Sequence, residues 1–108
     1  MLRILNIGLD RDILHVGEAQ DRQRIYARAL PASISHIVKA LPETSPERVE
    51  ICEDVDVFPC PVKHWSLFVP AAIRRGSEAL RDRRFDVIQA QDPFISGLAG
   101  AWLSRKFS

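Results

Sequence analysis

Residues 85–108 have the sequence FDVIQAQDPFISGLAGAWLSRKFS, in which signals for a strand, a tight turn and a helix follow one another. The segment 85–90 is a short apolar run with β-branched members, too short for a helix, and it predicts a buried strand. Asp92 can cap the helix that follows, and Pro93 suits a first helical position, where a missing N–H has no partner to lose. Small residues at spacings of three and four, beginning at Gly97, would let this helix lie close against a sheet.

The turn after this strand is the first place to look for a binding site. In an open parallel α/β sheet, ligands bind beyond the carboxyl ends of the strands. Gln91 and Asp92 directly follow the predicted strand, so both are candidate binding residues. On the residues alone, a capping role for Asp92 is favoured slightly over contact with a ligand.

The chain has 108 residues, of which 46% are hydrophobic and 27% are charged, and its formal net charge is +1. This length suits at most one domain and is at the low end for a complete doubly wound sheet. The composition is that of an ordinary globular protein, and the small net charge gives no general attraction to nucleic acid. We therefore expect no nucleic-acid partner.

No apolar run in the sequence approaches the length of a signal-peptide core or of a membrane span, so we expect a soluble, cytoplasmic protein. In that compartment Cys52 and Cys60 are expected to be free thiols. The cysteines and histidines lack the spacing of a metal site, and we expect no metal. His36, which lies between β-branched neighbours, is interpreted as a packed or hydrogen-bonded residue and not as a catalyst.

The first part of the chain alternates between strand and helix patterns. Residues 2–9 predict a near-continuous apolar strand, and residues 33–39 predict a second strand. Between them, 19–30 favours a helix, with Ile25 on its apolar stripe and Tyr26 beside it. The next part of the chain should therefore return to the same sheet.

The middle of the chain predicts an edge and a basic helix. Segments 49–51 and 55–58 predict either two short strands or one interrupted edge strand, with acids on a solvated face. Ser66 is a candidate cap for a helix whose apolar residues recur at offsets of three, four, seven and eleven from Val69. The basic face of this helix, Arg74–Arg84, fits solvated ion pairs better than peripheral contact with anionic lipid at the inner face of a membrane, which is the alternative.

This order of elements predicts an α/β fold, namely a Rossmann-like open parallel sheet with helices on both faces. We expect the parallel strands in the order third, second, first, fourth. The long loop after the first strand could cover a ligand, although it lacks the G-x-G-x-x-G fingerprint and the lysine-bearing phosphate loop. If 85–90 is the last strand, its unpaired edge could recruit another chain, so we expect self-association.

Three segments resemble the amino-terminal half of a family 4 (group 1) glycosyltransferase of the two-Rossmann-domain (GT-B) type. They are RILNIGLD at 3–10, DRQRIYA at 21–27, and FDVIQAQDP at 85–93 with GLAG at 97–100.

The resemblance implies that 1–108 is a truncated half of that two-domain architecture, a partial acceptor-side domain without the carboxyl-terminal nucleotide-sugar domain. It implies retaining transfer of a sugar from a nucleotide-sugar donor to a sugar acceptor, with no separate cofactor. We expect no transfer by this part alone, because it lacks groups that stabilise the departing diphosphate.

The resemblance also bears on the candidate site residues. Many family members place a histidine just before the acid and proline of the last segment, where this chain has Gln91. An amide can hydrogen-bond to a sugar hydroxyl or a phosphate oxygen but cannot transfer a proton. The turn holding Asp10 and Arg11 matches the part of the family that lines the cleft, and Arg11 could contact a phosphate or an acidic acceptor. The predicted cleft residues are therefore Gln91 and Asp92, then Asp10 and Arg11, with no catalytic residue.

Two other functions stay open. The first is a small non-enzymatic α/β regulatory or ligand-binding module, although the acidic cluster and lysine of receiver-like domains are not evident. The second is a nucleotide-binding enzyme of another class, because fold alone does not decide function. The absence of both phosphate-loop signatures counts against this second alternative.

Overall fold

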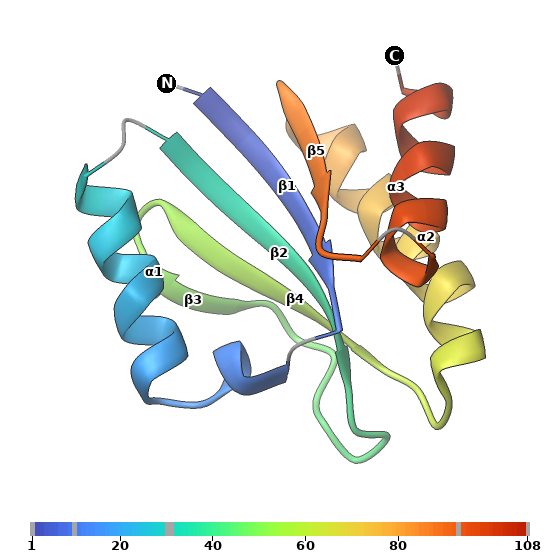
Figure 1. Cartoon of the computed structure of the whole chain (residues 1–108), viewed down its shortest axis with the longest axis horizontal. Coiled ribbons are helices and arrows are strands. Elements are labelled where there is room, and N and C mark those ends of the chain that lie inside the picture. The colour runs from blue at the N-terminus through green and yellow to red at the C-terminus, as the bar shows by residue number, and fades with distance from the viewer. Residues whose placement is uncertain (1, 10, 30–31, 93, 108) are drawn as a thin grey trace.

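A computed structural model describes residues 2–9, 11–29, 32–92 and 94–107 of the chain. Within these ranges the strands are β1 (Leu2–Gly8), β2 (Ala32–Ala40), β3 (Val49–Cys52), β4 (Val55–Pro61) and β5 (Val87–Ala90). The helices are the 3-10 turn η1 (Arg11–Leu14) and the α-helices α1 (Glu18–Ala29), α2 (Trp65–Asp82) and α3 (Ile95–Lys106). Figure 1 shows how these elements are arranged.

The strands form one twisted sheet in the order β3-β4-β2-β1-β5. β4, β2, β1 and β5 are parallel and follow the predicted order, which confirms the Rossmann-like α/β fold. β3 runs antiparallel to β4, so the two segments that the sequence left open as one strand or two form a hairpin. β5 lies at the other edge and has no outer partner strand among the described residues. Self-association through that edge stays a prediction.

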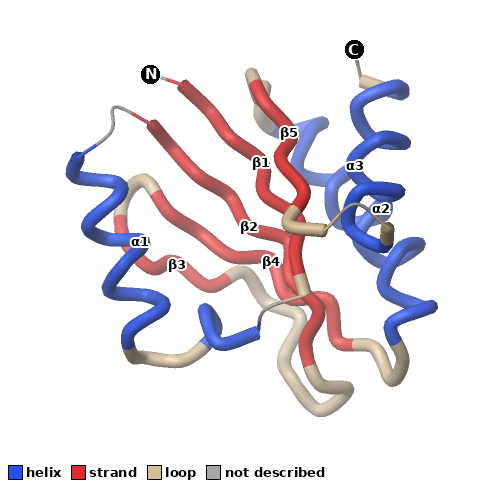
Figure 2. Tube along the Cα trace, in the orientation of Figure 1, coloured by secondary structure: helices blue, strands red, loops and turns tan. Residues whose placement is uncertain are grey.

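Helices cover both faces of the sheet, as Figures 1 and 2 show. On one face, α2 and α3 pack on the inward side chains of β1 and β2, among them Leu5, Ile7 and Ile37, which are fully buried. On the other face, η1 and the strands form a smaller apolar cluster around Ile13 and Val57. The sheet is thus a central layer between two helical layers, the arrangement that buries strands on both sides.

α2 and α3 approach one another closely because small residues lie between them and the sheet. A Cβ at Gly76 of α2 would overlap the side chain of Leu103 of α3. Gly100 of α3 faces β1 and β5, where a Cβ would lie 3.5 Å from Ile88 and 3.8 Å from Ala90. The strand, turn and helix predicted at residues 85–108 are therefore present, including the close approach at Gly100.

The prediction that the strand is buried is wrong, because β5 is an edge strand and Val87 is 44% exposed. The helix α3 begins at Ile95, and Pro93, the predicted first helical residue, lies outside the described residues.

The predicted start of α2 is wrong by two residues. His64, not Ser66, is the N-cap, and its ring nitrogen Nδ1 accepts a hydrogen bond of 3.2 Å from the backbone N–H of Ser66. An imidazole nitrogen can satisfy a free amide of the first turn as a hydroxyl would. The predicted apolar stripe of the helix is confirmed, since Ala72 and Gly76 are buried.

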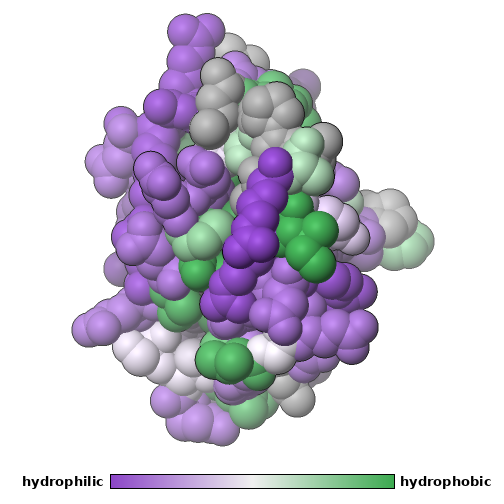
Figure 3. Space-filling view, turned by 90° about the vertical axis from the view of Figure 1, so that its left-hand side faces the viewer, coloured by the Kyte–Doolittle hydropathy of each residue, from purple (hydrophilic) through white to green (hydrophobic). Residues whose placement is uncertain are grey.

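The predicted apolar stripe of α1 is also wrong. Ile25 is 58% exposed and Tyr26 is 47% exposed. The helix is instead held through polar residues on its inner side, where Gln20 is buried and its Nε2 donates to the carbonyl of Ile13 at 2.9 Å. Figure 3, which looks onto the α1 side of the molecule, shows a mostly hydrophilic surface with small apolar patches.

Candidate functional site

The carboxyl ends of β1 and β5 meet at Gly8 and Gln91. Ile7 pairs with Ala90 in the parallel ladder, and the backbone N–H of Gln91 continues it by donating to the carbonyl of Ile7 at 2.9 Å. A Cβ at Gly8 would overlap the side-chain carboxamide of Gln91. The side chain of Gln91 therefore lies across the end of β1, in space that only glycine leaves free.

A cavity of about 250 Å³ opens beside Gln91, between α1 and the sheet. Its lining comes from η1, α1, β2 and the turn after β5, and consists of Ile13, Ala19, Arg22, Gln23, Tyr26, His36, Val38 and Gln91. The side chains that carry polar groups come from segments far apart in the sequence. Their convergence at the carboxyl edge of a parallel sheet is the usual location of a ligand site in this fold class.

His36 forms the floor of this cavity and takes part in a buried chain of hydrogen bonds. It is 4% exposed, and its Nδ1 lies 3.0 Å from Nδ2 of Asn6. Its Nε2 lies 3.1 Å from Oε1 of Gln23. Burial lowers the pKa of His36 to about 4, with the charge of Asp56 acting in the opposite direction. The imidazole is therefore neutral at pH 7 and holds Gln23 in place, which confirms the predicted hydrogen-bonded role.

Arg22 is the cation of this cavity. It is exposed at the wall formed by α1 and makes no ion pair with any described residue. Its neighbour Asp21 pairs with Arg24 at 2.9 Å. No described Asp or Glu lines the cavity, so its charge is positive and its remaining polar groups are neutral.

Asp92 has the predicted capping role. Its Oδ1 accepts hydrogen bonds from the backbone N–H groups of Phe94, Ile95 and Ser96 at 3.1, 2.7 and 3.2 Å. Contact with Ser96 and these backbone amides lowers the pKa of Asp92. Asp92 is not among the residues that line the cavity. Its carboxylate fixes the turn that carries Gln91, and its predicted contact with a ligand stays a prediction.

The other two predicted cleft residues lie at the turn after β1. Asp10 is outside the described residues. Arg11 begins η1, and its side chain lies outside the described part of the structure. Their predicted place in the cleft therefore stays a prediction.

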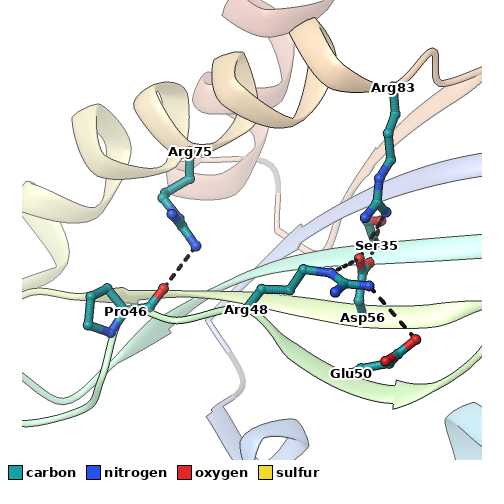
Figure 4. Close-up of polar contacts among 7 residues, drawn as sticks. All are labelled: Ser35, Pro46, Arg48, Glu50, Asp56, Arg75 and Arg83. Atoms are coloured by element: carbon teal, nitrogen blue, oxygen red, sulfur yellow. Dashed lines mark hydrogen bonds and ion pairs between the residues drawn. The ribbon is translucent and has the colours of Figure 1, made fainter.

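A second polar cluster lies on the opposite face of the sheet, below α2, and Figure 4 shows its members. Asp56 of β4 is 4% exposed, and its carboxylate accepts from Ser35 at 2.5 Å, Arg48 at 2.6 Å and Arg83 at 2.8 Å. Burial acts to raise the pKa of Asp56, but these hydrogen bonds outweigh it, and the pKa is lowered. The prediction that the acids of this region face solvent is wrong for Asp56, because the side chains of Ser35, Arg48 and Arg83 surround its carboxylate on the α2 face of the sheet.

The basic face of α2 is largely paired. Arg74 and Arg75 lie 3.7 Å and 3.3 Å from Glu78, and Nη2 of Arg75 also donates to the carbonyl of Pro46 at 2.9 Å (Figure 4). Arg83 belongs to the Asp56 cluster. The predicted ion pairs are therefore present, while peripheral contact with a membrane stays a prediction. None of the helices in the described ranges is long and apolar enough to cross a membrane.

Both cysteines are free, as predicted. Burial raises the pKa of the Cys60 thiol to about 12, so this side chain is inert near neutral pH. Across the described ranges, no three His, Cys, Asp or Glu side chains gather as a metal would need. The chemistry that this arrangement supports is hydrogen bonding and charge recognition.

The model of a family described as a glycosyl transferase 4-like domain matches residues 8–108. Neither a curated protein nor a solved structure matches the chain. The matched range includes α1, β2 and the turn at Gln91, and so contains every residue that lines the cavity.

Proposed function

The chain belongs to the glycosyl transferase 4-like domain family, and from this premise we propose that it forms the acceptor side of a sugar-transfer site. The proposed reaction moves a sugar from a nucleotide-sugar donor to a hydroxyl of an acceptor, with retention at the anomeric carbon. We expect a second Rossmann-like unit to hold the donor diphosphate, since charge developing on that leaving group needs dedicated partners. This chain would then bind and orient the acceptor.

The placement of Gln91 is the observation that carries this proposal. Its carboxamide lies across Gly8, at the meeting point of two parallel strand ends and on the wall of the cavity. A carboxamide offers both a donor and an acceptor, the pair of groups that a sugar hydroxyl uses. It has no proton to exchange near neutral pH, so we assign it to orienting the acceptor and not to acid or base catalysis.

Asp92 would hold the turn that carries Gln91. The backbone carbonyl of Asp92 accepts from the N–H of Gly97 at 2.9 Å, and its side chain binds the first amides of α3. These bonds fix the turn between β5 and α3. Asp10 and Arg11 are proposed as further cleft residues at the neighbouring turn after β1.

The test is sugar binding to the whole chain. Glucose, mannose, galactose and N-acetylglucosamine are titrated into isotope-labelled protein while the backbone amides are followed by NMR. We expect at least one sugar to shift the amides of Gly8, His36 and Gln91. Gln91→Ala should weaken that binding roughly fivefold or more, the loss of one or two neutral hydrogen bonds.

The matched control is Gln89→Ala. Gln89 is an exposed glutamine of β5, two residues before Gln91, and does not line the cavity. The substitution Gln89→Ala should therefore leave sugar binding unchanged. The acceptor role is refuted if none of the sugars shifts those amides, or if the two substitutions weaken binding equally.

A further inference from the structure

The hydrogen-bond chain beneath the cavity has a direction. The Nδ2 group of Asn6 can only donate, so the Nδ1 atom of His36 accepts and the ring proton lies on Nε2. That proton is donated to Oε1 of Gln23. The carboxamide of Gln23 has thus used its oxygen, and its NH₂ group, with two hydrogens, has no partner among the described residues.

Gln23 is therefore a donor on the cavity wall, and Arg22 lies beside it on α1. The guanidinium of Arg22 adds five N–H donors and a positive charge that does not depend on pH. Glu18, one turn earlier in the helix, does not pair with it. The hydroxyl of Tyr26, one turn after Arg22, adds a further donor to the same wall.

This wall has an excess of donors and one uncompensated charge, while no described carboxylate lines the cavity. A neutral sugar hydroxyl would leave several donors without an acceptor. An oxyanion supplies several acceptor sites and the opposite charge, and charge-assisted hydrogen bonds are roughly twice as strong as neutral ones. The groups on α1 are thus better matched to an anion than to a hydroxyl.

We propose that the cavity between α1 and the sheet binds an oxyanion carried by the acceptor, either a phosphate or a carboxylate, through Arg22 and Gln23. This assignment rests on the proposed acceptor role and narrows it to acidic acceptors. Gln91, on the turn after β5, holds the sugar hydroxyls, and Arg22 with Gln23, on α1, holds the charged group.

The experiment compares four probes on the whole chain by NMR titration: glucose, glucose 6-phosphate, glucuronate and inorganic phosphate. We expect glucose 6-phosphate or glucuronate to bind at least about tenfold more tightly than glucose, the effect of one charge-assisted bond. The tighter of the two identifies the anion as phosphate or carboxylate.

Arg22→Gln should remove this preference, so that the two charged sugars bind about as weakly as glucose does. Arg28→Gln is the matched control, because Arg28 is an exposed arginine of the same helix that does not line the cavity. Gln23→Glu keeps an oxygen for His36 but replaces the donor group by a negative charge, so it should reverse the preference in favour of glucose.

The possible results separate the two proposals. If glucose binds as tightly as its charged relatives and Gln91→Ala weakens all three, the acceptor site stands and the oxyanion assignment fails. Equal losses in Arg22→Gln and Arg28→Gln also overturn the assignment, since they reduce it to net charge. If inorganic phosphate binds through Arg22 while no sugar competes, the oxyanion site stands and the acceptor role fails. If none of the probes binds, both fail.

Discussion

Ser35 and His36 are consecutive residues of β2, and both are buried and polar, but they lead into two regions of opposite character. Ser35 points toward α2, into the cluster around Asp56, where the carboxylate is met by two arginines and a hydroxyl. His36 points toward α1, into a chain of neutral groups that ends at an open cavity. On the α2 side of the sheet the polar groups bond to one another, whereas on the α1 side some polar groups at the cavity have no partner among the described residues.

The difference separates a structural role, at the Asp56 cluster, from the binding role proposed for the cavity. Both regions contain arginine, a residue that often marks a functional site, and the identity of the residue does not distinguish them. The state of pairing does, because a buried carboxylate and the arginines already bonded to it have little left to offer a ligand, whereas an unpaired donor at a cavity is free to bind one. The following predictions test this contrast, from the largest expected effect to the smallest.

Removing the centre of the closed cluster should have the largest effect. Asp56→Ala leaves Arg48, Arg83 and Ser35 without their shared acceptor, and breaking a buried ion pair by deleting one partner costs about 3 kcal/mol. We expect a loss of this size in the free energy of unfolding, measured by urea denaturation. Glu50→Ala is the control, since Glu50 is exposed and lies 3.9 Å from Arg48, and it should cost less than about 0.5 kcal/mol. Equal losses would mean that closure of the cluster contributes nothing.

Acid should next weaken the fold through His36. Its pKa is about 4 in the folded chain and 6.5 as the ordinary value, so between these values the unfolded chain binds more protons and stability falls as the pH falls. We expect about 2.5 kcal/mol to be lost between pH 8 and about pH 4.5. The carboxyls of Asp56 and Asp92, whose pKa values are lowered, give up their contribution only below their ordinary value of 3.8.

The measurement is a set of urea denaturation curves across this pH range. His36→Gln keeps a hydrogen-bonding side chain in β2 but does not titrate, so its stability should vary little over the same range. A slope with pH that is the same in the variant and the parent chain would show that another group is responsible.

Two arginines give the most direct comparison of the regions. Arg83 donates to Asp56 and to Ser35, at 2.8 and 3.2 Å, so Arg83→Gln should lower the free energy of unfolding by about 1.5 kcal/mol. Arg22 forms an ion pair with no described residue, so Arg22→Gln should change the free energy of unfolding by less than about 0.5 kcal/mol. Thermal or urea unfolding of the two variants side by side is sufficient. A larger loss of unfolding free energy for Arg22→Gln would mean that Arg22 stabilises the fold as Arg83 does.

An effect on stability smaller than that of Arg83→Gln is expected at Gly8. The backbone at Gly8 does not have a positive φ, so alanine is compatible with it, but the new Cβ would displace the side chain of Gln91. Because that side chain is exposed and can move, we expect Gly8→Ala to cost less than about 1 kcal/mol. The side-chain NH₂ resonances of Gln91 should nevertheless shift, and sugar binding should weaken.

A double-mutant cycle isolates this contact. In the Gln91→Ala background, Gly8→Ala meets no carboxamide and should have no further effect on sugar binding. Additive effects of the two substitutions would mean that position 8 acts on binding by a route other than Gln91.

Much of the fold was predictable because it depends on local patterns. The apolar runs of β1 and β2 and the stripe of α2 follow directly from burial on a sheet. The errors fall where a neighbour changes the environment. Asp56 was placed in solvent because alternation does not reveal that Arg48 and Arg83, from outside the strand, meet on its side of β4. Ile25 was placed on a buried stripe because the pattern of α1 gives no sign that the sheet beneath presents His36, which needs a polar partner.

The candidate site was predictable only in part, from the rule that ligands bind beyond the carboxyl ends of parallel strands. Gln91 could be chosen because it follows a strand, and it lines the cavity, while its contact with a ligand stays a prediction. Arg22 and Gln23, which line the cavity, were not among the predicted cleft residues, since an exposed arginine and a glutamine on a helix normally face solvent. The remaining signal was the polar character of α1 on its inner side, which has meaning only once β2 and its histidine are placed beneath it.

The overlap between Gly8 and Gln91 has a consequence for the history of the family. Two positions near opposite ends of the chain share one small volume, so a side chain gained at one has to be given up at the other. Among relatives, position 8 should therefore be larger only where position 91 is smaller, and the pair should show correlated substitution. Lineages that exchange the two in this way would carry the proposed acceptor contact on the first strand instead of the last.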